Sequence, residues 1–236
     1  MWKTINKPKY FTTFSVLQKH SLCKKYFHTG TLDVLAFGKL LIVNKNLRFL
    51  ESFFKSLKKE YEFSFILGFK TDSQDLLGAI TNYSIKSVEV GLEDLESVLK
   101  TLQKKGLQKP PKISYKNLNT KSKLEKFLKG EPLPNVRERR TKLLNFTFLR
   151  KNKYKKKELM EELDNLKKIK QDFRQEKVIS RYLRVLDKLP NEFTQYTFKV
   201  KVTSGFYIRS LVRDIGEILN VPTVTTSIKR TAFKLF

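Results

Sequence analysis

The chain has 236 residues, of which 49 are Lys or Arg and 23 are Asp or Glu, so its formal net charge is +26. An excess of this size repels itself in the folded state, and a polyanion such as nucleic acid is the usual compensating partner. An acidic membrane surface is the competing explanation, and an AT-rich genome would also raise the Lys content. A single cysteine, Cys23, excludes an internal disulfide and any zinc site built from several cysteines.

The sequence offers no apolar stretch of membrane-spanning length. Its longest apolar-rich stretch, residues 32–43, is interrupted by Asp33, Gly38 and Lys39, whereas a spanning helix needs about 20 apolar residues. The N-terminus lacks the apolar core of a signal peptide. The chain has only two histidines and contains no metal-binding or nucleotide-binding motif. We therefore expect a cytoplasmic protein with no metal, no cofactor and no membrane partner.

The N-terminal half predicts strands and helices after an irregular start. Residues 1–27 are polar and basic without clear periodicity, and they predict no element. Apolar residues at period two indicate strands, and a spacing of three or four indicates helices. The elements predicted on this basis are a buried strand at 39–43, a helix at 47–57, a strand at 61–67, a polar loop at 68–78 and a helix at 92–102.

The C-terminal half predicts further helices and strands that do not alternate strictly. The predicted elements are a short helix at 121–128 closed by Gly130, strands at 143–149, 193–202 and 221–228, and a helix at 206–219. From Arg150 to Arg184, apolar residues recur every three or four positions among thirteen Lys or Arg and six Asp or Glu, which predicts one long amphipathic helix. Together these elements predict a single α+β domain with a mixed sheet over residues 1–236.

Two segments place polar residues where a plain fold would not need them. Residues 28–33 (His-Thr-Gly-Thr-Leu-Asp) bring a carboxylate beside an apolar strand, where it can be aimed into a site; an Asp in an ordinary turn is the alternative. Arg209 falls in the first turn of a predicted helix, where the helix dipole disfavours a cation unless an anion lies nearby. A carboxylate held bidentately would satisfy this arginine, and a surface or phosphate-binding arginine is the alternative.

Two further segments are weaker on their own. Tyr61 opens an alternating strand, and Thr71-Asp72 and Asp75 follow in the next loop. A tyrosine can stack on an extruded base and supply a hydroxyl, although a core tyrosine would show the same pattern. Residues 108–111 (Gln-Lys-Pro-Pro) form a stiff turn that is compatible with either a structural or a functional role.

Taken together, these segments resemble the TruB-type tRNA pseudouridine synthases over nearly the whole chain and in the same order. The matching motifs are Lys7-Pro8, residues 28–38, Tyr61 with Leu67-Gly68, Thr71-Asp72 and Asp75, residues 108–114, residues 204–216 and residues 228–231. One such motif would be weak, whereas six in the right order are specific. The resemblance implies an α+β fold with a mixed, mainly antiparallel β-sheet flanked by helices and a central RNA-binding cleft.

The resemblance also implies an activity. The family converts a uridine in the T-loop of transfer RNA, at position fifty-five, to pseudouridine without a cofactor. By this resemblance Asp33 would be the nucleophile, and Arg209 would hold it ionised and aligned. Tyr61 would stack on the flipped base and serve in proton removal. The expected partner is the T-arm of tRNA, and the expected state is a monomer.

The resemblance assigns six further residues to the pocket and to RNA binding. His28 would help to hold the T-loop open, and Asp75 would support the site from behind. The remaining residues, which would line the pocket or bind RNA, are Lys7, Tyr207, Ile228 and Arg230.

Several positions depart from the family pattern. Phe27 stands where Gly is usual, Val34 where Pro is usual, and Tyr10 at the Gly of the Lys-Pro-x-Gly motif. These departures concern the residues expected to bind the T-loop more than those expected to catalyse the reaction. The family's small C-terminal RNA-binding (PUA-like) domain is expected to be absent. The basic segment at about 151–190 is interpreted either as a solvated insertion or as an added RNA-binding arm that replaces the lost affinity.

Three other functions fit parts of the same pattern. An RNA-binding chaperone that opens and refolds tRNA would not need Asp33, Tyr61 and Arg209, all of which are present. A synthase that acts on ribosomal RNA within a larger ribonucleoprotein would be expected to carry extra partner-binding segments. A generic basic RNA-binding protein would be indifferent to Asp33, so substitution of this residue separates it from the enzyme.

Overall fold

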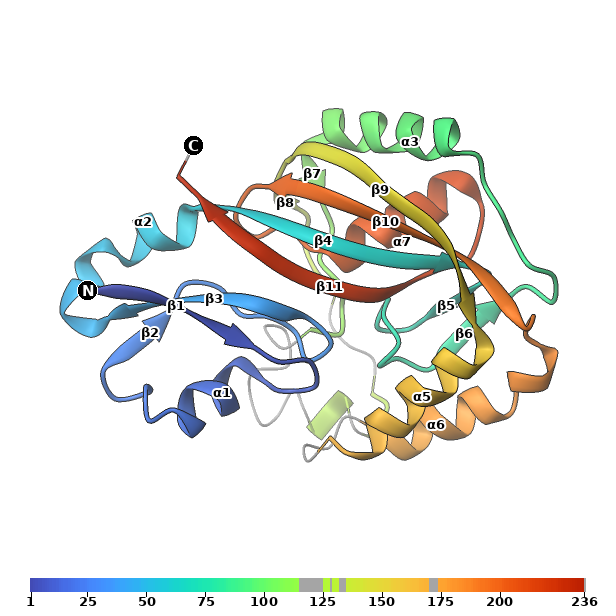
Figure 1. The fold of residues 1–236 in the computed structure, drawn as a ribbon, viewed down its shortest axis with the longest axis horizontal. Coiled ribbons are helices and arrows are strands. Elements are labelled where there is room, and N and C mark those ends of the chain that lie inside the picture. Colours follow the sequence, from blue (N-terminus) through green and yellow to red (C-terminus); the bar gives the residue numbers. More distant parts are fainter. Residues whose placement is uncertain (115–124, 128, 132–134, 170–173, 236) are drawn as a thin grey trace.

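A long β-sheet runs through the centre of the computed structural model (Figure 1). The structure describes residues 1–114, 125–127, 129–131, 135–169 and 174–235. In spatial order, the main row of strands is β1 (Trp2–Lys7), β3 (Phe37–Asn44), β11 (Thr223–Lys234), β4 (Lys58–Leu67), β10 (Glu192–Val202) and β9 (Leu143–Lys155). A further strand, β2 (Tyr26–His28), pairs with β3 outside this row.

The sheet is mixed and mainly antiparallel, which confirms the predicted fold class. Within the described residues its one parallel pairing joins β11 to β3, where Lys229 and Arg230 lie opposite Phe37 and Gly38. This pairing connects the last strand of the chain to the strand that follows the Asp33 loop. Two small sheets are separate from the main sheet. One pairs β5 (Phe69–Thr71) with β6 (Ile80–Tyr83), and the other pairs β7 (Leu107–Gln108) with β8 (Arg139–Arg140).

Helices cover both faces of the sheet (Figure 1). They are α1 (Thr13–Lys19), α2 (Glu51–Ser56), α3 (Leu92–Lys105), α5 (Lys156–Lys167), α6 (Gln175–Leu183) and α7 (Ile208–Leu219), with 3-10 turns η1 (Lys45–Leu50) and η2 (Leu186–Lys188). The main core lies between the central strands and the helices α3 and α7. In it Phe63 and Phe65 of β4 stack on Phe198 of β10, with ring centroids 6.2 and 6.3 Å apart. The period-two alternation of these strands places all three rings on one face.

A second core lies at the opposite face, where α5 and α6 run side by side near the end of β9 (Figure 1). Ile66 of β4 points to this side because it alternates with Phe65 and Leu67 of the main core, and Val224 of β11 lies opposite Ile66. Leu159 and Leu163 of α5 and Tyr182 of α6 are buried against them. The two helices therefore complete the packing of the sheet.

The prediction of one long helix from Arg150 to Arg184 is wrong. Residues 150–155 extend β9 and pair with residues 192–197 of β10, and the helix α5 begins only at Lys156. β9 is an edge strand, so its Lys side chains point to solvent while its backbone bonds to β10. The apolar spacing in this segment belongs to two shorter helices, α5 and α6, rather than to one. Phe173, one of the apolar residues in the spacing, lies outside the described residues.

Most other predicted elements are confirmed with shifted ends. The strands at 39–43, 61–67, 143–149, 193–202 and 221–228 and the helices at 92–102 and 206–219 are all present. The prediction for residues 1–27 is wrong, because they form β1, α1 and β2. The helix predicted at 121–128 falls mostly outside the described residues, and the polar loop at 68–78 includes β5.

Candidate active site

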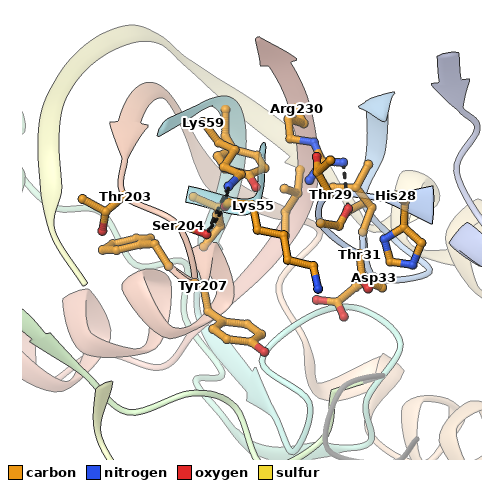
Figure 2. A pocket seen from close by; sticks show the side chains of 18 of the residues that line it. His28, Thr29, Thr31, Asp33, Lys55, Lys59, Thr203, Ser204, Tyr207 and Arg230 are labelled. Atoms are coloured by element: carbon orange, nitrogen blue, oxygen red, sulfur yellow. Dashed lines mark hydrogen bonds between the residues drawn. The ribbon is translucent and has the colours of Figure 1, made fainter. Parts of the chain in front are cut away.

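A pocket of about 620 Å³ opens between the Asp33 loop, β4 and the start of α7. Seven of the nine residues implied by the family resemblance line it: His28, Asp33, Tyr61, Tyr207, Arg209, Ile228 and Arg230. Figure 2 shows side chains from separate segments converging on this space, with Asp33, Tyr207 and Lys55 around its centre. Lys7 and Asp75 lie behind the pocket wall. Residues far apart in the chain thus meet at one site.

The central contact of this pocket is an ion pair between Arg209 and Asp33. The Nη2 atom of Arg209 donates a hydrogen bond to Oδ2 of Asp33 at 2.7 Å. The other terminal nitrogen, Nη1, donates to the carbonyls of Ser73 (2.7 Å) and Ile113 (2.9 Å) and lies 3.3 Å from Oδ2 of Asp75. The Arg209 side chain is 4% exposed and that of Asp33 is 23% exposed. The arginine is therefore a fixed buried cation, and its carboxylate partner stays open to the pocket.

Two neighbouring carboxylates stabilise the protonated form of Arg209. Burial alone would lower the pKa of this guanidinium, but Asp33 and Asp75 outweigh burial and raise it. The helix dipole at the start of α7 disfavours a cation there, as the sequence indicated. Two carboxylates, rather than one bidentate partner, compensate it. The anion expected near Arg209 is thus shared between two residues.

Asp75 supports Arg209 from the buried side. Its carboxylate accepts hydrogen bonds from the Ser73 hydroxyl at 2.6 Å and from the Leu77 N–H at 3.1 Å. Burial raises the pKa of Asp75, while Arg209 acts in the opposite direction. The Asp72–Gly78 turn between β5 and β6 therefore fixes Arg209 through both a carboxylate and a backbone carbonyl.

Lys7 holds the back of the Asp33 loop. Its side chain is 1% exposed, and its Nζ donates to the carbonyls of Ala36 and, at 3.4 Å, of Val34. Burial lowers the pKa of Lys7 to about 7, and attraction by Asp33 only partly opposes this effect. Lys7 thus lies behind the loop rather than in the pocket wall.

The depressed pKa of Lys7 predicts a pH-dependent contribution to stability. The unfolded chain binds this proton up to about pH 10.5, whereas the folded chain releases it near pH 7, so stability rises with pH between these values. We expect wild type to gain stability relative to Lys7→Met when the pH rises from 6.5 to about 9.5. Urea unfolding of both proteins at the two pH values measures this; a constant difference would mean that Lys7 stays charged in the fold.

Arg230 ties the loop to the sheet from the other side of the pocket. Its Nε donates to the Lys39 carbonyl at 2.6 Å and its Nη2 to the Gly30 carbonyl at 3.1 Å. Burial lowers the pKa of Arg230. A Cβ at Gly38 (φ +100°) would lie 2.4 Å from the Arg230 carbonyl oxygen, so the parallel pairing requires glycine there. Arg230 therefore shapes the loop as well as lining the pocket.

Three more of the implied residues enclose the pocket. Tyr61 and Ile228 are buried on the neighbouring strands β4 and β11, and both face the cavity. His28 is half-buried, and its Nδ1 has no hydrogen-bond partner among the described residues. Burial, assisted by Arg230 and Lys55, lowers the pKa of His28 below its usual value, so the imidazole is neutral at neutral pH.

The structure explains the Gln-Lys-Pro-Pro segment and adds two pocket-lining lysines that the sequence patterns did not single out. The side chain of Gln108 makes two hydrogen bonds with the backbone of Tyr207, at 2.8 and 3.0 Å, so the Gln-x-Pro-Pro motif positions the start of α7. Lys55 and Lys59 also line the pocket, and burial lowers the pKa of Lys59 to about 8. The Lys59 Nζ donates to Ser204 at 3.1 Å (Figure 2). Nothing in their local spacing distinguished these lysines from solvated ones.

Across the described ranges, no three His, Cys, Asp or Glu side chains gather as they would around a metal ion. Among the same residues, no helix has the length and apolar character needed to cross a membrane.

Comparison with known proteins places this arrangement in a family. Residues 18–163 match the model of the TruB family pseudouridylate synthase N-terminal domain. The chain is 28% identical to tRNA pseudouridine synthase B of Fusobacterium nucleatum and 29% identical to that of Aquifex aeolicus, over 96% of its length in both cases. It spans 65% and 66% of these relatives.

Solved structures show the same fold. One is the crystal structure of a Cbf5-Nop10-Gar1 complex, with a TM-score of 0.58 at 18% identity, covering 98% of this chain and 48% of the matched chain. Another is an H/ACA ribonucleoprotein bound to a substrate RNA containing 2'-deoxyuridine, with a TM-score of 0.54 at 16% identity, covering 98% of this chain and 47% of the other. Because the family model covers more than half of the sequence and the fold agrees with it, the chain belongs to the TruB family of pseudouridylate synthases.

Proposed function

We propose that this chain isomerises the T-loop uridine of tRNA, at position fifty-five, to pseudouridine, with Asp33 as the nucleophile. The observation that carries the proposal is the Asp33–Arg209 ion pair of 2.7 Å, whose arginine is buried and whose carboxylate reaches the pocket. A carboxylate beside RNA phosphates needs such a cation to stay charged. The relatives from Fusobacterium nucleatum and Aquifex aeolicus are tRNA pseudouridine synthases by name, which supports the choice of substrate.

The pocket has the size and lining for one extruded nucleotide. Its volume of about 620 Å³ lies within the usual range for small ligands, and apolar and aromatic side chains face its polar centre. Extruding a base from folded RNA costs a few kcal/mol, which stacking in the pocket would offset. Tyr61, which lines the pocket, would stack on the uracil, and Tyr207 and Ile228 would enclose it. His28, as a neutral imidazole at the rim, would contact the opened T-loop.

The reaction conserves atoms, so it needs neither oxidant nor co-substrate. The bond from uracil N1 to the ribose C1′ breaks, the base turns while it is held in the pocket, and a bond from C5 to C1′ forms. The hydrogen on C5 then leaves as a proton, and N1 gains one. Asp33 would assist the first step by attacking the sugar or by otherwise helping to detach the base, and Tyr61 would serve in removal of the C5 proton.

The surface charge supports a nucleic-acid partner beyond the pocket. The net charge of +26 gives a field that draws RNA to the protein at low ionic strength. Exposed basic residues of α5 and α6, such as Lys157, Lys167 and Lys177, would add sequence-independent phosphate contacts. The protein would act as a cytoplasmic monomer on the T-arm, without a metal or another cofactor.

A T-arm hairpin that carries 5-tritiated uridine tests the proposal directly. Because the C5 hydrogen leaves during the reaction, we expect tritium release by the full chain and one pseudouridine per hairpin at the T-loop position. A hairpin with cytidine at this position is the control and should give none. Binding of the hairpin without any release would instead favour the tRNA-refolding chaperone.

A further inference from the structure

Glu162 of α5 makes contacts that neither the pocket nor the RNA-binding surface explains. One oxygen, Oε1, accepts a short hydrogen bond from the Lys9 ammonium, and the other, Oε2, accepts one from the Tyr10 hydroxyl. The Lys9 ammonium also lies 5.0 Å from the centre of the Tyr10 ring. The Glu162 side chain is only 20% exposed. A helix distant in sequence thus holds the turn after β1 at two adjacent residues.

The turn formed by Lys9 and Tyr10 contacts the Asp33 loop through its backbone. The Tyr10 N–H donates to the carbonyl of Val34, the residue next to Asp33, at 2.9 Å. Lys7, on the other side of the turn, donates to the same carbonyl at 3.4 Å. The Glu162 side chain therefore reaches the loop of the proposed nucleophile through a single residue.

Tyr10 adopts a conformation that needs such an anchor. Its φ is +65°, in the left-handed region that favours glycine, where the Cβ of a bulky residue crowds the backbone. Relaxing Tyr10 to the ordinary region would swing its N–H away from Val34. The hydrogen bond from the Tyr10 hydroxyl to Glu162 holds the Tyr10 side chain, and the one from Lys9 holds the residue before it, so both oppose this relaxation.

We propose that Glu162 is a positioning residue, which holds the Lys9–Tyr10 turn so that Tyr10 fixes the loop bearing Asp33. This inference rests on the proposed function of Asp33. It gives part of the basic helical segment a role other than RNA binding, because a carboxylate on a helix of an RNA-binding arm would repel phosphate. Farther along the same basic segment, Arg174, which precedes α6, pairs with Asp72 at 3.0 Å, and Asp72 begins the Asp72–Gly78 turn whose Ser73 carbonyl accepts from Arg209.

The test compares Glu162→Ala, Glu162→Gln and Tyr10→Phe with Glu161→Ala, an exposed carboxylate one position earlier on the same helix. We expect Glu162→Ala to lower kcat on the T-arm hairpin about tenfold, because small displacements of a reacting group cost this much. KM should stay within about twofold, since no phosphate contact is lost. Tyr10→Phe should lose a similar factor, and Glu162→Gln should recover part of the rate, because its amide oxygen still accepts from Tyr10.

Hydrogen exchange of the backbone provides a readout independent of activity. We expect the peptides that contain Tyr10 and Ala36, whose N–H groups donate to the carbonyls of Val34 and Asp33, to exchange faster in Glu162→Ala than in Glu161→Ala, with melting temperatures that match. Wild-type rates and wild-type exchange in Glu162→Ala would overturn the inference, as would a loss confined to KM. If wild type itself forms no pseudouridine, the proposed function fails, and the exchange comparison still decides whether Glu162 fixes the loop.

Discussion

Replacement of Asp33 by Asn should abolish pseudouridine formation and leave RNA binding intact. Loss of a nucleophile typically costs 10³-fold or more in turnover, so we expect tritium release from the T-arm hairpin to fall by at least about 10³-fold. The Asn side chain keeps the shape of Asp and can still accept a hydrogen bond from Arg209. The arginine also keeps Asp75 and two backbone carbonyls, so the fold should survive at a cost of about 1–3 kcal/mol.

The affinity of Asp33→Asn for RNA separates a loss of catalysis from a loss of RNA binding. Removing a negative charge from the pocket favours a polyanion, so the Kd for the hairpin should be unchanged or slightly lower. Asp187→Asn, an exposed carboxylate outside the pocket, is the matched control and should retain full turnover. Turnover by Asp33→Asn at the wild-type rate would refute the nucleophile, although family membership would stand.

The sequence predicted the central ion pair because local and distant signals agreed. A cation in the first turn of a predicted helix required an anion, and the family resemblance implied that Asp33 is that anion. The structure adds Asp75 as a second partner, so the guanidinium is shared between two carboxylates. A sequence gives no measure of how a single side chain divides its donors among neighbours.

Contacts formed by buried charges were harder to foresee. The family resemblance assigned Lys7 to the pocket wall, whereas it is buried behind the loop and donates to backbone carbonyls, a rare position for a charged side chain. The contact of Tyr10 with Glu162 joins residues more than 150 positions apart, and no periodicity encodes it. The end of edge strand β9, residues 150–155, was interpreted as helix because the alternating lysines of an exposed edge have no apolar face to mark them.

Removal of the Arg209 guanidinium should produce the largest loss of stability in the site. In Arg209→Met, Asp75 stays 2% exposed with no cation beside it, and breaking a buried ion pair in this way costs about 3–5 kcal/mol. Pseudouridine formation should vanish as well, because Asp33 loses the donor that aligns it. Arg209→Lys keeps the charge, but a single ammonium cannot hold both carboxylates and both carbonyls, so it should rescue the activity poorly.

The pH dependence of this loss identifies its origin. Burial already raises the pKa of Asp75 above 3.8 in the presence of Arg209, and without the arginine it rises further. A carboxyl with a raised folded pKa favours the folded state most at low pH, and this advantage is lost as the pH rises from the unfolded value through the folded one. The stability gap between wild type and Arg209→Met in urea unfolding should therefore be smaller at about pH 4.5 than at pH 7.5.

The double variant Arg209→Met/Asp75→Asn separates charge from packing. If the buried unpaired carboxylate causes the loss, neutralising it should recover stability at pH 7.5 and flatten the pH dependence, while activity stays absent. An Asn at this position can still accept the hydrogen bonds of Ser73 and Leu77, so its own cost should be small. If the double variant were no more stable than Arg209→Met, the loss would come from the four contacts of the guanidinium rather than from the charge left on Asp75.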